Sequence, residues 1–133
     1  MEAIAGTYHG EGRWYDSAGQ SGAYHVSQTN RILTDGVEIA YHHAFDDGSV
    51  IDARLTLNTL APQLYRVLMA GTAVGHGSWL DETLHYHLEL GGKFVEVGYR
   101  VHEGELRVSG SSSRNAAGNY IAWVERLRRV ATT

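Results

Sequence analysis

Cysteine is absent from this sequence, and proline occurs once in 133 residues. A chain without cysteine has neither a disulfide framework nor a thiolate metal cage, and a cytosolic setting fits that usage. No apolar run approaches the length that spans a bilayer, and the first six residues lack the basic and apolar regions of a signal peptide. We therefore expect a soluble, cytoplasmic protein with one domain over residues 1–133. A domain of this size can bury a hydrophobic core without help from disulfides or metal ions.

An excess of basic charge is also missing. Eleven lysines and arginines face fifteen aspartates and glutamates, which gives a net charge of -4. Nucleic acids and anionic membranes are bound by basic patches, so neither is an expected partner. The arginines at 126, 128 and 129 are typical of a solvated strand edge.

Glycine, by contrast, is abundant, with sixteen residues. Glycine permits bends and bulges whereas proline interrupts strand pairing, so this balance favours bent strands and hairpins. Alternating polar and apolar segments fill the chain, separated by Asp-Gly, Gly-Gly and Glu-Gly steps that suit hairpin turns. The pattern predicts strands over residues 4–15, 24–33, 37–45, 50–58, 64–69, 73–80, 83–90, 93–101, 105–112 and 120–130.

Closure of these strands decides the fold class. About ten strands on so short a chain would curl or leave unpaired edges, and a barrel removes those edges. The alternative is a sandwich of two sheets, but short connections from each strand to the next favour the barrel. The prediction is an all-β fold, a single antiparallel meander barrel of about ten strands.

Alternation along the strands also assigns an inner face, because side chains two residues apart share one side. The inner set is mostly aliphatic, and a barrel of about ten strands is generally too wide for side chains alone to fill. Gly75 and Gly77 share the face of Trp79 and leave room for that indole or for a guest molecule. Rings with polar tips interrupt the aliphatic set and are the expected ligand contacts: Tyr41, His43, Tyr65, Trp79, Tyr86 and Tyr99.

His43 is the most informative of these residues, because alternation places its imidazole among apolar neighbours. An inward histidine is more often a satisfied core residue than a ligand or a base. If it is functional, it orients a polar group of the ligand or acts as a general base beside a tyrosine.

A second group of histidines falls on the opposite, polar face. A two-residue turn at 81–82 places His76 opposite His87, and a turn at 91–92 places Glu96 opposite His87. With His85 these side chains form a patch with cross-strand spacings of about 5 Å, which suits zinc or a non-haem metal. Surface ladders of this kind are common, so we expect no bound metal and keep a metal enzyme as an alternative.

Two segments carry a family resemblance. The residues Gly6-Thr7-Tyr8-His9-Gly10-Glu11-Gly12 resemble the opening strand of calycin-type barrels, which include lipocalin, fatty-acid-binding and nitrobindin-like proteins. The resemblance implies a calycin-like barrel with Tyr8 as the aromatic plug at its base. Residues 121–126 are similar to the closing strand, which implies that Arg126 or Arg128 packs over Tyr8. Nitrobindin-like haem ligation uses a late histidine; none follows His102, so no haem and no other cofactor is expected.

The sequence thus predicts a barrel that holds a small apolar or aromatic ligand, with Tyr8 at the base and His43 as the polar anchor. Two alternatives stay open. One is an enzyme on the same barrel, either a cyclase, lyase or isomerase using His43 and tyrosines or the metal enzyme at His76, His85 and His87. The other is a ligand-free barrel that self-associates, for example as a homodimer.

Overall fold

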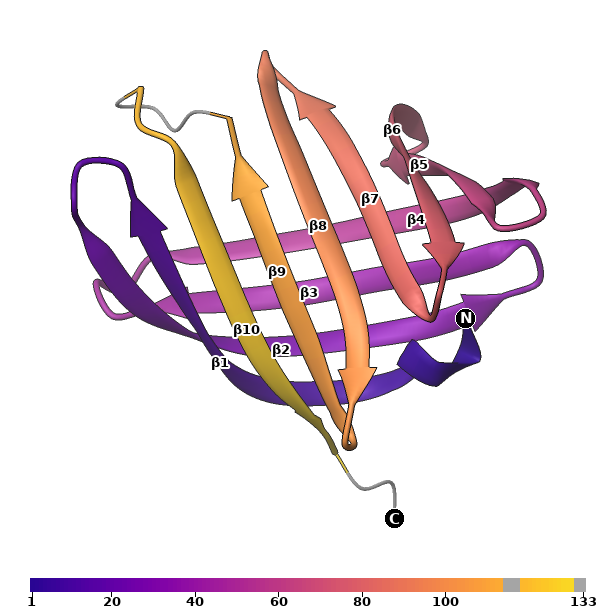
Figure 1. Cartoon of the computed structure of the whole chain (residues 1–133), viewed down its shortest axis with the longest axis horizontal. Coiled ribbons are helices and arrows are strands. Elements are labelled where there is room, and N and C mark those ends of the chain that lie inside the picture. Colours follow the sequence, from indigo (N-terminus) through magenta and orange to yellow (C-terminus); the bar gives the residue numbers. More distant parts are fainter. Residues whose placement is uncertain (114–117, 131–133) are drawn as a thin grey trace.

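A computed structural model describes residues 1–113 and 118–130. These residues form a closed barrel of ten antiparallel strands, in which each strand pairs with the next and β1 pairs with β10 (Figure 1). The predicted meander barrel is therefore confirmed, and the sandwich is excluded because the sheet has no open edge. The elements are η1 (Glu2–Ile4), β1 (Gly6–Asp16), β2 (Ser21–Leu33), β3 (Gly36–Phe45), β4 (Val50–Ala61), β5 (Leu64–Met69), β6 (Thr72–Leu80), β7 (Thr83–Leu90), β8 (Lys93–His102), β9 (Glu105–Ser112) and β10 (Ile121–Arg129).

Tight hairpin turns set the register of the central strands. In the turns at 70–71, 81–82, 91–92 and 103–104, both residues have positive φ. That geometry matches the right-handed twist of the flanking strands. The predicted turns at 81–82 and 91–92 are confirmed, because Leu80 pairs with Thr83 and Leu90 with Lys93.

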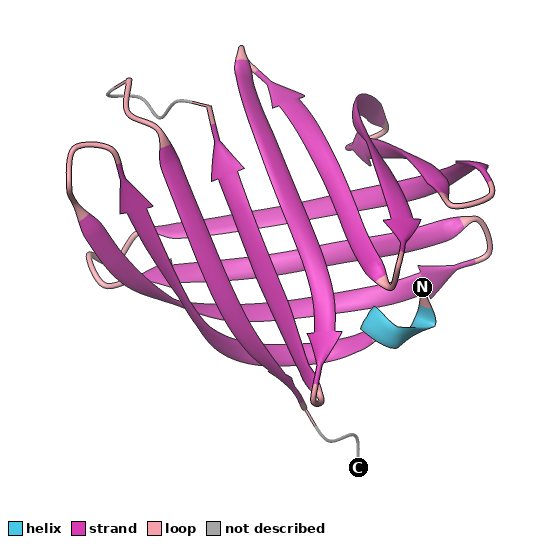
Figure 2. Cartoon of the chain, viewed as in Figure 1, coloured by secondary structure: helices cyan, strands magenta, loops and turns pink. Residues whose placement is uncertain are grey.

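The start of the chain differs from the prediction. Residues Glu2–Ile4 form the single turn of 3₁₀-helix η1, and the first strand begins at Gly6 rather than at Ile4 (Figure 2). Gly6 has a φ of 136°, which disfavours any residue with a side chain, and it turns the chain into the strand. Ile4 is fully buried in the core.

The barrel has two unlike ends. We call the end with the β1–β2, β3–β4, β5–β6, β7–β8 and β9–β10 connections the open end, and the other the closed end. Helix η1 lies at the closed end, beside the end of β8 (Figure 1). There the Tyr8 hydroxyl donates to the Ile4 carbonyl at 3.0 Å, and the Arg129 guanidinium donates to the Tyr8 hydroxyl at 2.9 Å and to the Ala3 carbonyl at 3.0 Å.

The arginine over Tyr8 is not the one that the family resemblance implied. The Arg129 guanidinium carbon lies 5.4 Å from the centre of the Tyr8 ring, so Arg126 and Arg128 were wrong choices. Alternation explains the error, because Leu127 on β10 is fully buried and residues two apart share its inward face. Arg126 points outward instead and bonds Glu105 at 3.0 Å.

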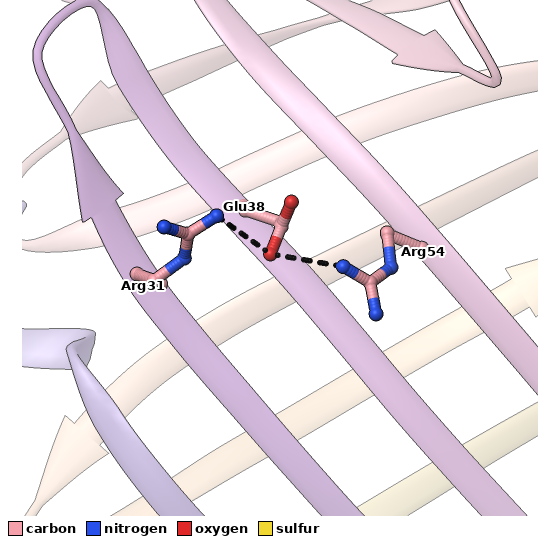
Figure 3. A network of polar contacts seen from close by, with 3 residues as sticks. All are labelled: Arg31, Glu38 and Arg54. Carbon is pink, nitrogen blue, oxygen red and sulfur yellow. Dashed lines mark hydrogen bonds and ion pairs between the residues drawn. The ribbon is translucent and has the colours of Figure 1, made fainter.

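The outer face of the barrel is polar, as alternation predicted. There the carboxylate of Glu38 on β3 contacts Arg31 on β2 at 3.3 Å and Arg54 on β4 at 3.4 Å (Figure 3). Both arginines are exposed, and such surface pairs contribute little to stability. Among the described residues, no helix is long and apolar enough to cross a membrane.

Candidate functional site

A cavity of about 580 Å³ occupies the part of the barrel that faces the open end. Its volume lies in the range of small-molecule sites. The described lining residues come from β1–β4, from β7–β10 and from two connections of the open end, and none comes from β5 or β6. The lining comprises Trp14, Asp16, Gln20, Tyr24, Gln28, Tyr41, His43, Phe45, Ser49, Val50, Ile51, Tyr86, Leu88, Leu90, Val95, Val97, Tyr99, Val108, Ile121, Trp123 and Glu125.

The two walls of the cavity differ in chemistry. The wall formed by β7, β8 and β9 is largely aliphatic. The wall formed by β2 and β3 is a row of rings, in which Tyr41 stacks on His43 with centroids 4.5 Å apart. The Tyr24 ring lies 4.9 Å from His43 and 5.0 Å from Phe45. A flat apolar guest would meet ring faces on one side and methyl groups on the other.

Two indoles line the cavity where β1 pairs with β10. Trp14 and Trp123 are register partners on these strands. A Cβ at Gly22 would lie 2.6 Å from the Trp14 ring, and a Cβ at Gly110 would lie 2.5 Å from the Trp123 ring. Glycine at these positions is therefore what lets each indole lie across the neighbouring strand.

A buried carboxyl group is the main polar feature of the cavity. Glu125 on β10 is only 3% exposed. The Tyr24 hydroxyl donates to its Oε2 at 2.7 Å, and Nε2 of His43 lies 3.5 Å from the same oxygen. A buried carboxyl without such partners would be strongly destabilising, so this trio of Glu125, Tyr24 and His43 is the polar centre of the cavity.

Gly12 on β1 makes the Tyr24–Glu125 bond possible. Gly12 pairs with Tyr24 on one side and with Glu125 on the other. A Cβ at this position would lie 2.2 Å from the Tyr24 ring. The bare backbone of Gly12 therefore lets the tyrosine cross over β1 and reach a carboxyl group two strands away.

Burial controls the protonation of the polar centre. It raises the pKa of Glu125 to about 7, against a smaller lowering by the bond from Tyr24. It lowers the pKa of His43 to about 4, helped by the neighbouring His42. Burial also raises the pKa of Tyr24, with Glu125 as the next cause. At neutral pH the imidazole is therefore uncharged, and the carboxyl group is close to half ionised.

Polar side chains separate the cavity from the closed end. The hydroxyls of Tyr86 and Tyr99 lie 3.1 Å apart, and the two rings meet edge to face. The Gln28 amide donates to Asn30 at 2.9 Å, and the Asn30 amide donates to the Ile4 carbonyl at 2.9 Å. This layer connects the base of the cavity to helix η1.

The structure divides the residues predicted to contact a ligand into two groups. Tyr41, His43, Tyr86 and Tyr99 all line the cavity. Tyr8, Tyr65 and Trp79 lie outside its lining, because each sits on a strand close to the closed end. Gly75 and Gly77 make no room for a guest: a Cβ at Gly75 would lie 1.8 Å from the His87 carbonyl oxygen, and one at Gly77 would lie 3.0 Å from Tyr86.

Sequence reasoning missed several lining residues with polar or ring chemistry, among them Tyr24, Trp123 and Glu125. Alternation did carry a signal for them. Leu127 on β10 is apolar, and counting back in twos from it reaches Glu125 and Trp123. A glutamate in that series was not recognised because a charged residue normally indicates the solvent face.

The predicted histidine patch forms in register but not as a metal site. His76 pairs with His87, and His87 pairs with Glu96, as expected. The His76 and His87 rings are 5.8 Å apart and tilted, and His87 stacks on Phe94. No group of three or more His, Cys, Asp or Glu residues in the described parts of the chain is arranged to hold a metal ion. The geometry therefore gives the metal-enzyme alternative no support.

The polar centre has the groups that acid–base chemistry needs. Glu125, with its pKa near 7, can take up or release a proton at neutral pH, and His43 and Tyr24 contact the same carboxyl oxygen. The alternative of an enzyme that uses His43 and tyrosines therefore stays open, with Glu125 as an additional group.

The comparisons with known proteins agree on the fold. No family model and no curated protein matches the chain. Several solved structures match the chain over at least 96% of its length. The S-type phycobiliprotein lyase CPES from Guillardia theta has 12% identity and a TM-score of 0.80, over 99% of this chain and 91% of its own. Rv2717c from M. tuberculosis has 13% identity and a TM-score of 0.69, over 96% and 93%.

The third structure, EF1p2_mFAP2b bound to DFHBI, has 10% identity and a TM-score of 0.52, over 97% of this chain and 95% of its own. At identities this low, the similarity shows that the fold is shared and says nothing about activity. The neighbours are ten-stranded antiparallel barrels, which is the architecture that the calycin resemblance implied.

Proposed function

We propose that this barrel binds a small, largely apolar or aromatic molecule in its interior. The observation that carries the proposal is the cavity of about 580 Å³, whose wall of rings and aliphatic side chains holds the buried polar centre of Glu125, Tyr24 and His43. Binding sites for small molecules are typically apolar with a few placed polar groups. The ligand lies between the Tyr41–His43 rings and Val97, with its polar group toward Glu125.

The structural neighbours support this proposal. One of them is named as a phycobiliprotein lyase, and another was solved bound to DFHBI. Both share the closed barrel of this chain. Two alternatives remain: the enzyme that uses His43 and tyrosines, and a ligand-free barrel that self-associates. The second of these requires an interior that takes up no guest molecule.

Uptake of a neutral aromatic dye tests the proposal. N-phenylnaphthylamine becomes fluorescent in apolar surroundings, and we expect saturable enhancement with the unmodified protein. In the variant Val97→Trp the indole projects into the cavity and obstructs it, because Val97 lines it and is only 7% exposed. The variant should lose most of the enhancement.

The matched control is Val124→Trp, which adds the same side chain at a position that is 51% exposed and outside the cavity lining. This variant should bind the dye like the unmodified protein. Equal binding by the Val97 and Val124 variants, or no saturable binding by the unmodified protein, contradicts the proposed function.

A further inference from the structure

The described lining of the cavity carries charged side chains of one sign. Its described lining residues include two carboxylic acids, Asp16 and Glu125, and neither lysine nor arginine. Asp16 lies near the open end, where its carboxylate accepts the backbone N–H groups of Ala18 and Gln20. His43 is the one imidazole among the described lining residues, and burial lowers its pKa to about 4, so it carries no positive charge at neutral pH.

Among the residues that the structure describes, Glu125 has no cationic partner on any element packed against it. Its neighbour on β1 is Gly12, and its neighbour on β9 is Val108. The titratable groups that face it from the cavity wall are phenols and one imidazole. These are Tyr24 on β2, Tyr41 and His43 on β3, Tyr86 on β7 and Tyr99 on β8.

The negative field of Glu125 reaches across the cavity. Burial is the main cause that raises the pKa of Tyr24, Tyr41 and Tyr86, and the charge of Glu125 contributes to each. A second negative group placed in this space would be repelled. A positive group would be attracted, because opposite charges in surroundings of low dielectric interact strongly.

The rings around the carboxyl group add to this preference. The Tyr41 ring stacks on the His43 ring, and the Tyr24 ring lies against the ring of Phe45. The faces of aromatic rings carry negative electrostatic potential and attract cations, most strongly where water is excluded. A buried carboxyl group and ring faces together form a site that suits an organic cation.

We propose that the cavity selects hydrophobic amines, molecules with an apolar body and a protonated nitrogen, and that the nitrogen pairs with Glu125 beside Tyr24 and His43. The inference rests on the proposed function, since it needs a cavity that takes up a guest. It goes further by excluding carboxylates such as fatty acids as preferred ligands.

Proton linkage follows from this arrangement. An ammonium group binds the ionised form of Glu125, and burial raises the pKa of that carboxyl group to about 7 in the free protein. At pH 6 only about one-tenth of the protein has the ionised carboxylate, so an amine should bind about tenfold more weakly there than at pH 8. A neutral ligand of the same shape has no reason to show this dependence.

Three ligands of one shape test the inference by isothermal titration calorimetry at pH 8: phenylbutylamine, phenylbutanol and phenylbutyrate. The amine should bind about tenfold or more tightly than the alcohol, as a charge-assisted bond allows, and the acid should bind more weakly than the alcohol. In Glu125→Gln, which keeps an oxygen for the Tyr24 hydroxyl, the advantage of the amine should disappear while the alcohol still binds.

Glu38→Gln is the matched control, because it makes the same change on the outer face, where Glu38 contacts Arg31 and Arg54 (Figure 3). It should leave all three affinities unchanged. An alcohol that binds as tightly as the amine, or an acid that binds best, overturns this inference and leaves the cavity proposal standing. If none of the three ligands binds, the proposed function fails with it. Alcohol binding by Glu125→Gln shows that the variant keeps a folded cavity.

Discussion

At the scale of single residues, Glu125 and His43 respond to burial in opposite directions. The pKa of Glu125 rises from 4.5 to about 7, and the pKa of His43 falls from 6.5 to about 4. The folded protein therefore holds a proton on Glu125 more tightly than the unfolded chain does. The stabilising contribution of Glu125 is complete below pH 4.5 and is lost as the pH rises through 7. That of His43 is complete above pH 6.5 and is lost as the pH falls through 4.

Urea unfolding at a series of pH values tests this pair of opposing effects. Relative to the unmodified protein, Glu125→Gln should gain free energy of unfolding as the pH rises from 4.5 to 7. The relative gain should approach about 3 kcal/mol, because each pKa unit corresponds to about 1.4 kcal/mol. His43→Gln should gain in the opposite direction, as the pH falls from 6.5 to 4. Stability curves of the variants that run parallel to that of the unmodified protein would falsify this account of the polar centre.

At the scale of elements, strand β1 has two glycines, and so no side chains, at inward-facing positions. Gly10 lies between Val26 and Leu127, and Gly12 lies between Tyr24 and Glu125. A Cβ at Gly10 would lie 2.0 Å from the Arg126 carbonyl oxygen. Without a side chain at Gly12, the Tyr24 ring of β2 crosses over β1 and its hydroxyl reaches Glu125 on β10.

Gly12→Ala tests the role of β1. The added methyl group forces the Tyr24 ring to move, so the free energy of unfolding should fall by about 1–3 kcal/mol, as expected for overpacking of a core. Dye binding should weaken as well, because the Tyr24 ring lines the cavity. In the control Gly98→Ala the new Cβ would lie 3.8 Å from the Ser109 hydroxyl, an ordinary contact. That variant should stay within about 0.5 kcal/mol of the unmodified protein, and equal losses in both variants would contradict the steric argument.

At the scale of the whole molecule, the two ends of the chain close the barrel together. The first and last strands pair along nine register positions, and helix η1 packs at the closed end beside them. Arg129 on β10 connects these parts, because its guanidinium bonds Tyr8 on β1 and the Ala3 carbonyl in η1. This contact joins the two ends of the chain, because Ala3 and Arg129 are 126 positions apart in sequence.

Arg129→Ala should lower the free energy of unfolding by about 1–3 kcal/mol, since it removes hydrogen bonds from a charged donor and a cation–π contact. Arg128→Ala removes the same side chain from the outward face of the same strand. It should change the stability by no more than about 0.5 kcal/mol. Thermal unfolding followed by circular dichroism measures both, and an equal effect of the two variants would show that Arg129 does not tie the closed end together.

The sequence by itself determined the strands, the turns and the inner face. Alternation of polar and apolar residues depends only on neighbours along the chain, and positive-φ turns depend on a few residues such as Gly91 and Gly92. For this reason the ten strands were predicted within three residues of their observed bounds, and the pairing of His76 with His87 was predicted correctly. The same alternation placed Tyr41, His43, Tyr86 and Tyr99 on the cavity side.

Only the tertiary structure decided the height of each residue along the barrel axis. Alternation gives the face of a strand but not the distance from either end, so Tyr65 and Trp79 were predicted beside a cavity that lies toward the other end. The meeting of Tyr24, Glu125 and Gly12 was equally hidden, because these residues come together through the pairing of the first and last strands. A contact across 101 positions depends on closure of the whole sheet, which no local pattern encodes.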